Sequence, residues 1–471
     1  MVGSIAARFT SGRLRTESVT SISSEIGNRN QLWRAKIFAA KSILGDSVLD
    51  QSEARQEAKL VSPGTRAIER CDALGVAPFS ESSELLYRRY LTPAHDCSLQ
   101  EIARWMRAED MRVRRDAMGN LSGRYDSGDP AAPCLLIGSH IDSVHNAGKY
   151  DGPLGIMIGI ELVAALRARG RRLPFGIEVI AFGDEEGSRY PDSMMCSRAV
   201  AGLLPEAALQ TVDHDGVSVA SALRAFGCDP TCVAGVARSP GSVLAYIEPH
   251  IEQGPVLEME NLPVGIVTAI AAQLRMKARF TGVAGHAGTS PMRLRYDALA
   301  AASEGILAVE RICSVPRDVV GTVGHVVTST RAYNVIVGEA ELFIDIRSGT
   351  DTMRDNVAAS VRSELASIAQ RRKLAVGFDV VQKLPATRCD PRLMDLMGEA
   401  VQHGGLSPFR LISGAGHDAI AVSHLAPTAM LFVRCVDGVS HNPRESVAAH
   451  DVDVAINVLV EFILRLSTTL A

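Results

Sequence analysis

Three short apolar runs in the first half of the chain, at residues 133–138, 176–182 and 243–251, constrain the fold most strongly. Each has the length of a buried strand and is followed by a polar island that contains glycine. A longer segment, 153–168, is typical of a buried helix, because apolar residues occupy most of its faces. Strands that alternate with helices predict an α/β fold with a doubly wound, mostly parallel sheet. In such sheets the chemistry lies at the carboxyl ends of the strands.

The middle of the chain has a different pattern. Residues 274–281 alternate between apolar and polar side chains, which is typical of a half-exposed strand. The expected elements follow the order β-α-β-β-α-β of a ferredoxin-like sandwich. They are strand 274–281, helix 297–312, strands 319–328 and 339–347, helix 352–371 and strand 375–381. Since 471 residues exceed one core, we expect a discontinuous catalytic domain at 62–263 and 381–471, with an α+β lid domain inserted at 264–380.

Composition argues against several functional classes. A net charge of −4 without a Lys/Arg stripe indicates no nucleic-acid partner. No apolar stretch has the length of a transmembrane helix, so we expect no membrane association. The nine cysteines are scattered and odd in number, which favours free thiols in a reducing compartment such as the cytoplasm. Residues 1–61 predict a weakly structured extension, and the three arginines before Glu17 leave a mitochondrial transit peptide as the alternative.

Five separated positions make a ligand set for two divalent metal ions, each in a short polar island beside an apolar run. They are His140, Asp151, Glu186, His250 and His441. Three imidazoles and two carboxylates suffice for two ions if one carboxylate shares both its oxygens, and we expect Asp151 to do so. Asp142 is placed to accept the other ring N–H of His140 and to fix its tautomer. We therefore expect two ions per subunit, Zn or Mn, with Co or Ni as alternatives.

Glu185 precedes the expected ligand Glu186, and adjacent carboxylates at a strand end point in different directions. A free carboxylate beside a metal site can act as a general base on water and later protonate a leaving nitrogen. Taken singly, these motifs have ordinary interpretations, because a lone His-x-Asp is usually a surface loop and a Glu pair a solvated acidic turn. Their placement after buried strands favours the metal site.

From about residue 63 to its end, the chain resembles the M20-type dinuclear amidohydrolases. It is most similar to the branch of allantoate amidohydrolases, N-carbamoyl-L-amino-acid hydrolases and β-ureidopropionases. The motifs that carry the resemblance follow one another along the chain: GSHIDSV, YDGPLGI, DEEGSR, HIEQGPVLE, GHAGTSPM, NVIVG, IDIRS, SGAGHDA and GVSHNP. The resemblance implies one metal held by His140, Asp151 and His250, another held by Asp151, Glu186 and His441, and Glu185 as the base.

The resemblance also implies that the inserted domain forms a homodimer and closes over the substrate. His286, in GHAGTSPM, matches the residue that reaches the partner subunit's active site and stabilises the tetrahedral intermediate. The family's substrate-binding positions match Gln253, Asn334, Arg347, Gly416 and His417. From the residues alone, Arg347 could either form a surface ion pair or anchor a substrate carboxylate. His286 and Asn334 could either donate to an oxyanion or form ordinary loop hydrogen bonds. His417 could either contact a ligand or mark the start of a helix.

These features predict hydrolysis of a ureido (carbamoyl) C–N bond in a small carboxylate. Allantoate is the first candidate, with release of ammonia and carbon dioxide, and N-carbamoyl-L-amino acids or N-carbamoyl-β-alanine are the alternatives. A hypothesis of another class is a non-catalytic binding protein stabilised by metal. Glu185 beside Glu186 argues against that hypothesis, because a binding site needs no free base.

Overall fold

The structure is a computed structural model that describes residues 61–129 and 131–469. Apart from Val61, the expected extension at 1–61 lies outside the described residues and stays a prediction. Among the helices of the described ranges, none has the length and apolar character needed to cross a bilayer.

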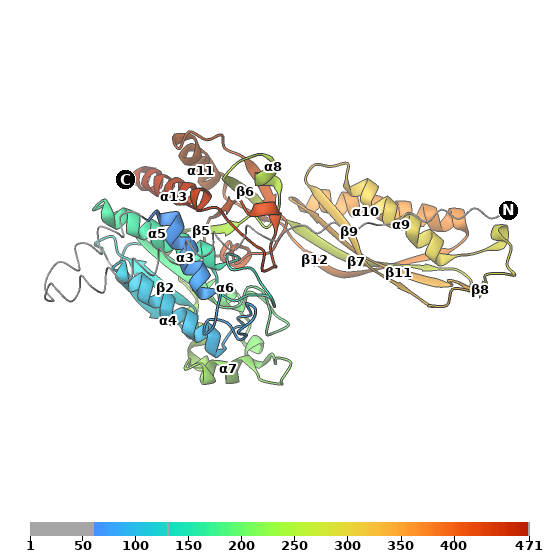
Figure 1. Ribbon diagram of the computed structural model, residues 1–471, viewed down its shortest axis with the longest axis horizontal. Coiled ribbons are helices and arrows are strands. Elements are labelled where there is room, and N and C mark those ends of the chain that lie inside the picture. The colour runs from blue at the N-terminus through green and yellow to red at the C-terminus, as the bar shows by residue number, and fades with distance from the viewer. Residues whose placement is uncertain (1–60, 130, 470–471) are drawn as a thin grey trace, which may run out of the picture. The chain divides into compact units, whose positions relative to one another are not determined.

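A sheet of nine strands carries the candidate site (Figure 1). Its order is β1-β2-β4-β3-β5-β15-β6-β13, and β14 also pairs with β6. The strands are β1 Arg112–Arg115, β2 Leu121–Tyr125, β3 Cys134–His140, β4 Gly176–Phe182, β5 Val243–Ile251, β6 Val264–Ile270, β13 Thr387–Arg388, β14 Arg410–Ser413 and β15 Thr428–Val433. The central strands β4, β3, β5 and β15 are parallel to one another. On the two sides, β1 and β2 and then β6 and β13 pair with their neighbours in this order in antiparallel orientation. The predicted doubly wound, mostly parallel fold class is confirmed.

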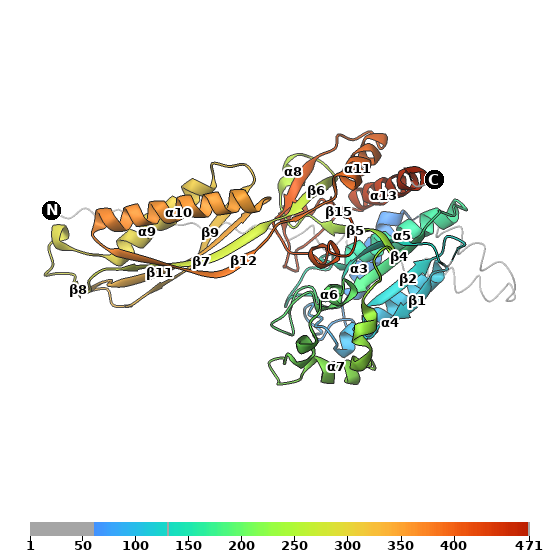
Figure 2. The same ribbon diagram turned by 180° about the vertical axis from the view of Figure 1, so that it is seen from behind.

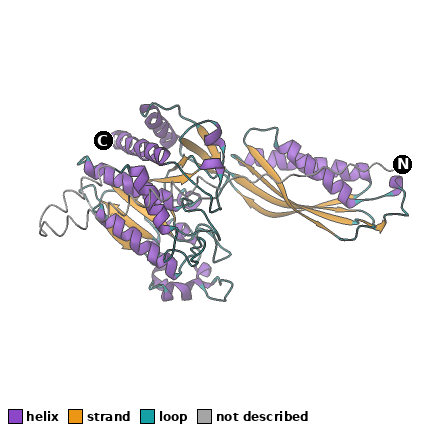
Figure 3. Cartoon of the chain, viewed as in Figure 1, coloured by secondary structure: helices purple, strands orange, loops and turns teal. Residues whose placement is uncertain are grey.

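Helices cover both faces of this sheet (Figure 3). One face carries α3 Pro63–Leu74, α4 Pro93–Ala108, α5 Pro153–Ala168, α11 Pro391–His403 and α13 Ala449–Thr469; the other carries α6 Met195–Val200, α7 Val219–Ala225, α8 Val256–Met259 and α12 Ala419–Val422. Successive residues of β3 show the reason. Leu135 and Ile137 pack into one core, and Cys134 and Leu136 into the other. A strand buried on both faces is apolar throughout, which is the pattern of residues 133–138.

The inserted segment forms a separate four-stranded antiparallel sheet in the order β12-β7-β11-β9 (Figure 2). Its elements are β7 Ala272–Thr281, α9 Ala298–Cys313, β9 Val319–Thr328, β11 Glu339–Ser348, α10 Asp351–Arg372 and β12 Ala375–Leu384. Alternate residues of β11, such as Leu342 and Ile344, are buried against the two helices. A small ladder of β8 Gly285–His286 and β10 Val335–Ile336 accompanies the sheet. The strand order is that of the expected ferredoxin-like sandwich.

The domain boundaries differ from the expected 264 and 380. Residues 264–270 form β6, which belongs to the large sheet through its pairing with β15. The smaller sheet begins at Ala272 and its last strand ends at Leu384. The N-terminal boundary was missed because a single residue, Ala271, separates two apolar strands, and no turn signal marks the change of sheet.

Candidate metal centre

The five expected metal ligands lie at the carboxyl ends of the central parallel strands. His140 is the last residue of β3, His250 is the penultimate residue of β5, and Asp151 lies in the turn before α5. Glu186 follows β4, and His441 lies in the loop between β15 and α13. Because parallel strands end at one edge of a sheet, side chains that are far apart in sequence meet there.

Asp151 lies between two groups of ligands. Its Oδ1 atom is 3.3 Å from Nε2 of His250 and 3.9 Å from Nε2 of His140. Its Oδ2 atom is 3.1 Å from Nε2 of His441, which is itself 3.5 Å from Oε1 of Glu186. One oxygen of Asp151 therefore faces each group. The ligand atoms of His140, Asp151 and His250 lie within 4.8 Å of one another, as do those of Asp151, Glu186 and His441.

The hydrogen bonds of two histidines fit a bound cation. Nδ1 of His140 donates to the backbone carbonyl of Asp142 at 3.1 Å, and Nδ1 of His250 donates to that of Ile251 at 2.9 Å. With the proton on Nδ1, each ring in its neutral form presents the lone pair of Nε2 to the centre. The two Nε2 atoms are 3.5 Å apart, beside the carboxylate of Asp151. Electron-pair donors that face one another in this way match the ligand chemistry of a divalent metal.

Asp142 positions the acidic pair as well as His140. Its carboxylate is buried, with Oδ1 3.5 Å from Nδ1 of His140. The same carboxylate accepts the backbone N–H of Glu185 at 3.0 Å and of Glu186 at 3.1 Å. The ring N–H of His140 is thus accepted by the backbone carbonyl of Asp142, whereas the expected acceptor was the carboxylate, which instead holds the acidic turn. Asp142 thereby orients two loops that carry expected site residues.

The carboxyl groups of the centre have very different proton affinities. Burial raises the pKa of Glu185 well above its usual value, although His140 works against the rise. Burial and then the charge of Asp151 raise the pKa of Glu186 to about 7. Burial opposes ionisation of Asp151 as well, but the hydrogen bond with His441 and the nearby His250 hold its pKa well below the usual value. The bridging position therefore favours an ionised carboxylate, whereas the position of Glu185 favours proton uptake.

A cavity of about 290 Å³ opens onto these side chains. Besides the five expected ligands and Glu185, it is lined by Ser193, Met194, Gln253, Arg275, Ala415 and Gly416. Gln253 donates to both oxygens of Asp151 at 3.1 Å. Of the expected substrate-binding residues, Gln253 and Gly416 are thus in the cavity. Met194, Gln253 and His441 have φ values of 58°, 58° and 52°, a left-handed backbone that side chains rarely adopt and that often marks a functional site.

His417 lies directly behind the cavity wall. Its ring is buried, with its centroid 4.5 Å from that of His250 in an edge-on arrangement, and its Nε2 is 2.7 Å from Oγ of Ser413. Burial holds the pKa of His417 well below its usual value, so the ring is neutral. Asp418, the next residue, is the N-cap of α12. The structure thus places His417 against the candidate ligand His250, at the start of a helix.

Glu445 and Ser440 contact the candidate ligands, although neither was among the expected site residues. Oε1 of Glu445 accepts the backbone N–H of Tyr150 at 2.8 Å and of Asp151 at 3.1 Å. Its Oε2 accepts the hydroxyl of Ser440 at 3.0 Å. Glu445 therefore ties the Asp151 turn to the loop of His441. The only available signal was its position four residues after His441 in GVSHNPRES.

The remaining expected residues are Arg347, His286 and Asn334. They belong to the inserted domain and are not among the residues that line the cavity. Arg347, in β11, donates to Asp345 and to the backbone carbonyl of Gly414. His286 is exposed in β8, where it pairs with Val335, and the carbonyl of Asn334 accepts the N–H of Ala287. The structure thus brings His286 and Asn334 together, outside the cavity of the candidate ligands in the same chain.

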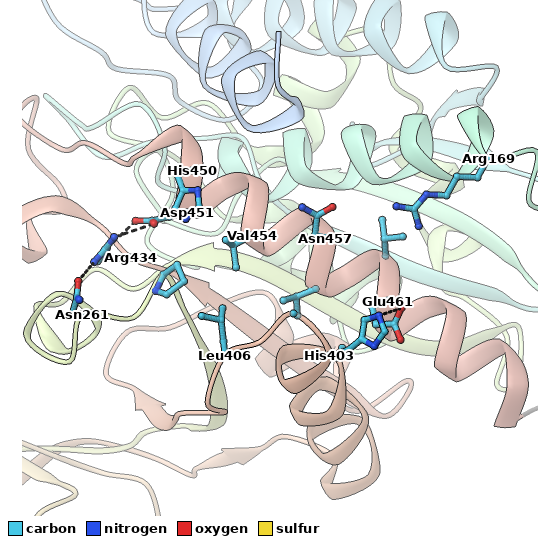
Figure 4. A pocket seen from close by; sticks show the side chains of 15 residues that line it. Arg169, Asn261, His403, Leu406, Arg434, His450, Asp451, Val454, Asn457 and Glu461 are labelled. Atoms are coloured by element: carbon cyan, nitrogen blue, oxygen red, sulfur yellow. Dashed lines mark hydrogen bonds and ion pairs between the residues drawn. The ribbon is translucent and has the colours of Figure 1, made fainter. Parts of the chain in front are cut away.

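A larger cavity of about 720 Å³ is lined by residues of α11 and α13 (Figure 4). Several of its charged groups are already paired. Arg434 donates to Asp451 at 2.8 Å and to Asn261 at 3.2 Å, and His403 is 3.8 Å from Glu461. None of the expected site residues lines this cavity. The smaller cavity, which holds the candidate ligands, is therefore the better candidate for catalysis.

Comparisons with known proteins identify the family of the chain. The model of peptidase family M20/M25/M40 matches residues 136–465. The chain is 40% identical over 366 residues to the N-carbamoyl-L-amino acid amidohydrolase of Geobacillus stearothermophilus, covering 78% of this chain and 90% of that protein. It is 37% identical over 433 residues to allantoate deiminase 1 of Glycine max, and the match covers 85% of this chain and 89% of that protein. An amidase of the hydantoinase/carbamoylase family from Burkholderia multivorans has a similar structure, with a TM-score of 0.79, 31% identity, and coverage of 86% and 98%. The chain therefore belongs to peptidase family M20/M25/M40 and is a hydrolase of C–N bonds.

Proposed function

We propose that this enzyme hydrolyses a ureido C–N bond of a small carboxylate, and that allantoate is its substrate. The observation that carries the proposal is the position of Asp151, whose two oxygens face His250 and His441 separately. Relatives at 40% and 37% identity are named for N-carbamoyl-L-amino acids and for allantoate, and both compounds contain a ureido group and a carboxylate.

Two divalent ions, Zn or Mn with Co or Ni as alternatives, complete this site in the proposal. One would be held by His140, Asp151 and His250, and the other by Asp151, Glu186 and His441. When bound, such ions lower the pKa of a water molecule and polarise the carbonyl oxygen under attack. Asp142 and Glu445 hold these ligands in place through the hydrogen bonds described above.

Glu185 is the proposed general base. It lines the cavity and its backbone is fixed by Asp142. A carboxylate with a raised pKa takes the proton of the attacking water readily, and as an acid it returns that proton to the leaving ureido nitrogen. The nitrogen then departs as ammonia, and the N-substituted carbamate that is left loses carbon dioxide to give the product amine.

Polar side chains in the cavity favour allantoate, which has two ureido arms. Met194 and Ala415 are the only apolar residues among those described as lining it, whereas Ser193, Gln253 and Arg275 offer hydrogen bonds. N-carbamoyl-L-amino acids are the second candidate, because of the 40% identical relative. N-carbamoyl-β-alanine completes the alternatives. A large apolar substrate side chain would find few partners in this cavity.

The proposal includes a homodimer formed through the inserted domain. His286 and Asn334 are exposed and lie outside the cavity of their own chain, so they would serve the site of the partner subunit. There they would donate to the oxyanion of the tetrahedral intermediate. We also place the enzyme in a reducing compartment, the cytoplasm, because its nine cysteines are free.

The test is a substrate panel with protein that has been stripped of metal and reloaded with Zn or Mn. Ammonia release is compared for allantoate, N-carbamoyl-L-amino acids and N-carbamoyl-β-alanine. Glu185→Gln should lower turnover by roughly 10²–10⁴-fold with the metal content unchanged, because only the base is lost. If the metal-loaded wild type cleaves no ureide or amide, a binding protein stabilised by metal becomes the better account.

A further inference from the structure

We propose that the larger cavity, between α11 and α13, is a second ligand site, and that it binds a small organic anion with an apolar body. The inference goes beyond the proposed function, which uses only the smaller cavity. Among the residues that the structure describes, the two cavities have no lining residue in common. A ligand in the larger cavity therefore leaves the candidate metal ligands accessible to a substrate.

One face of α13 forms a long wall of this cavity. The lining residues of the helix recur at the spacing of a single helical face: His450, Val454, Asn457, Val458 and Glu461. At 1.5 Å per residue, this wall is about 15 Å long. The cavity volume of about 720 Å³ lies in the range of small-molecule sites. The space is therefore elongated and large enough for a ligand of about ten non-hydrogen atoms.

The end of the cavity at the start of α13 offers an anion little. Arg434 lines this end, but each of its three nitrogens has an acceptor in the protein. Its Nε and Nη2 atoms donate to the two carboxylate oxygens of Asp451 at 2.8 and 3.0 Å, and its Nη1 donates to Oδ1 of Asn261 at 3.2 Å. The charge of this guanidinium is thus balanced by a carboxylate in bidentate contact.

The opposite end of the cavity has an unpaired cation, Arg169. Its exposed guanidinium has no hydrogen bond or ion pair within the part of the chain that the structure describes. Figure 4 shows this side chain reaching from the end of α5 toward Asn457 of α13. The acid at this end, Glu461, is already engaged, since it lies 2.8 Å from Nε of Arg465 and 3.8 Å from Nε2 of His403. A guanidinium with free N–H groups is the side chain that best matches a carboxylate.

Apolar side chains lie between the two ends. Leu406 and Val454 line the cavity and are only partly buried, where they pack against the main core. An aliphatic chain that covers them removes apolar surface from water, which stabilises the complex. An inorganic anion would leave these side chains uncovered, and a neutral chain would leave Arg169 unpaired. The geometry therefore assigns the head group to Arg169 and the apolar body to Leu406 and Val454.

The experiment measures binding of octanoate to the metal-loaded full chain by isothermal titration calorimetry, and 1-octanol serves as the same chain without a charge. Arg169→Gln should raise the Kd of octanoate by about 5–30-fold, because charge-assisted hydrogen bonds are lost at an exposed position. Arg171→Gln is the matched control, since Arg171 is also exposed, lies two residues further on and does not line the cavity. That control should match the wild type. The Kd of 1-octanol should be higher than that of octanoate in the wild type and should not change in Arg169→Gln.

A second variant, Val454→Trp, fills the middle of the cavity and should abolish octanoate binding. Octanoate binding that Val454→Trp leaves unchanged would place the probe elsewhere, the metal centre included, and would overturn the inference. Equal Kd values for Arg169→Gln and Arg171→Gln would do the same. So would a wild type that binds no octanoate, as expected if a second copy of the chain or another partner covers the cavity. None of these results depends on whether the protein cleaves a ureide, so the proposed function is tested separately.

Discussion

Glu445 accepts a hydrogen bond from the backbone N–H of Asp151 at 3.1 Å, although the two residues are 294 positions apart in the chain. Asp151 carries the two oxygens that face the two groups of candidate ligands, and Glu445 fixes the turn from which they project. Through Ser440, the same carboxylate reaches the loop of His441. One buried side chain therefore holds Asp151, the proposed bridging ligand, in register with the candidate ligand His441.

Replacing Glu445 should weaken metal binding without removing a ligand. In Glu445→Ala the N–H groups of Tyr150 and Asp151 lose their acceptor, and we expect the affinity for Zn or Mn to fall by roughly 10–100-fold. Competition with a chromogenic chelator measures this change. Glu399→Ala, which removes only an exposed ion pair with Arg465, is the control. Unchanged metal affinity in Glu445→Ala would show that the Asp151 turn needs no such support.

Gly152→Ala should displace His140. A Cβ atom at Gly152 would lie 2.5 Å from Cε1 of the His140 ring and 2.5 Å from its carbonyl oxygen, closer than real contacts allow. We expect loss of metal and of activity, together with a lower unfolding temperature. Gly170→Ala is the matched control, because Gly170 has a φ of 61° with nothing within 4 Å of the added atom. That control should lower the free energy of unfolding by about 1–2 kcal/mol, because alanine disfavours the left-handed backbone, and it should leave the metal content unchanged. Equal metal content in both variants would contradict the crowding argument.

Lys373→Gly should stabilise the protein. Lys373 ends α10 with a φ of 59°, where glycine is the favoured residue. We expect the free energy of unfolding to increase by about 0.5–1 kcal/mol, measured from the midpoint of urea unfolding. Ala366→Gly, at an exposed position inside the same helix, should lose about 1 kcal/mol. The same replacement residue therefore has opposite effects at two positions of one helix, and a loss at both would argue against the left-handed cap.

Elements with a strong local pattern were predictable from the sequence. Strands 176–182 and 243–251 and helix 153–168 occur with the expected bounds, because apolar runs of these lengths and the Gly152–Pro153 helix start leave few alternatives. Short edge strands such as β13 and β14 were missed, because their stability comes from pairing with β6 rather than from their own residues. The boundary expected at 264 falls instead at Ala271, between β6 of the large sheet and β7 of the smaller one, where no turn residue marks the change of sheet.

Residues of the site were predictable where a motif carried them. The convergence of His140, Asp151 and His441 followed from their positions after parallel strands. Glu445 and Arg275 were not predictable, since a glutamate in a loop and an arginine on an exposed strand face are ordinary features. Only the folded chain brings Glu445 to the Asp151 turn and Arg275 to the cavity. The roles proposed for His286 and Asn334 depend on a second subunit and stay predictions.

The number of metal ions per chain tests the central claim, that Asp151 bridges two ions, most directly. Protein stripped by chelation and reloaded with Zn or Mn is desalted, and its metal content is measured by inductively coupled plasma mass spectrometry. The account predicts two ions in the wild type, one in His250→Ala and one in His441→Ala, and neither in Asp151→Ala, because both groups share that carboxylate. A single ion in the wild type, or two ions retained by Asp151→Ala, would contradict it.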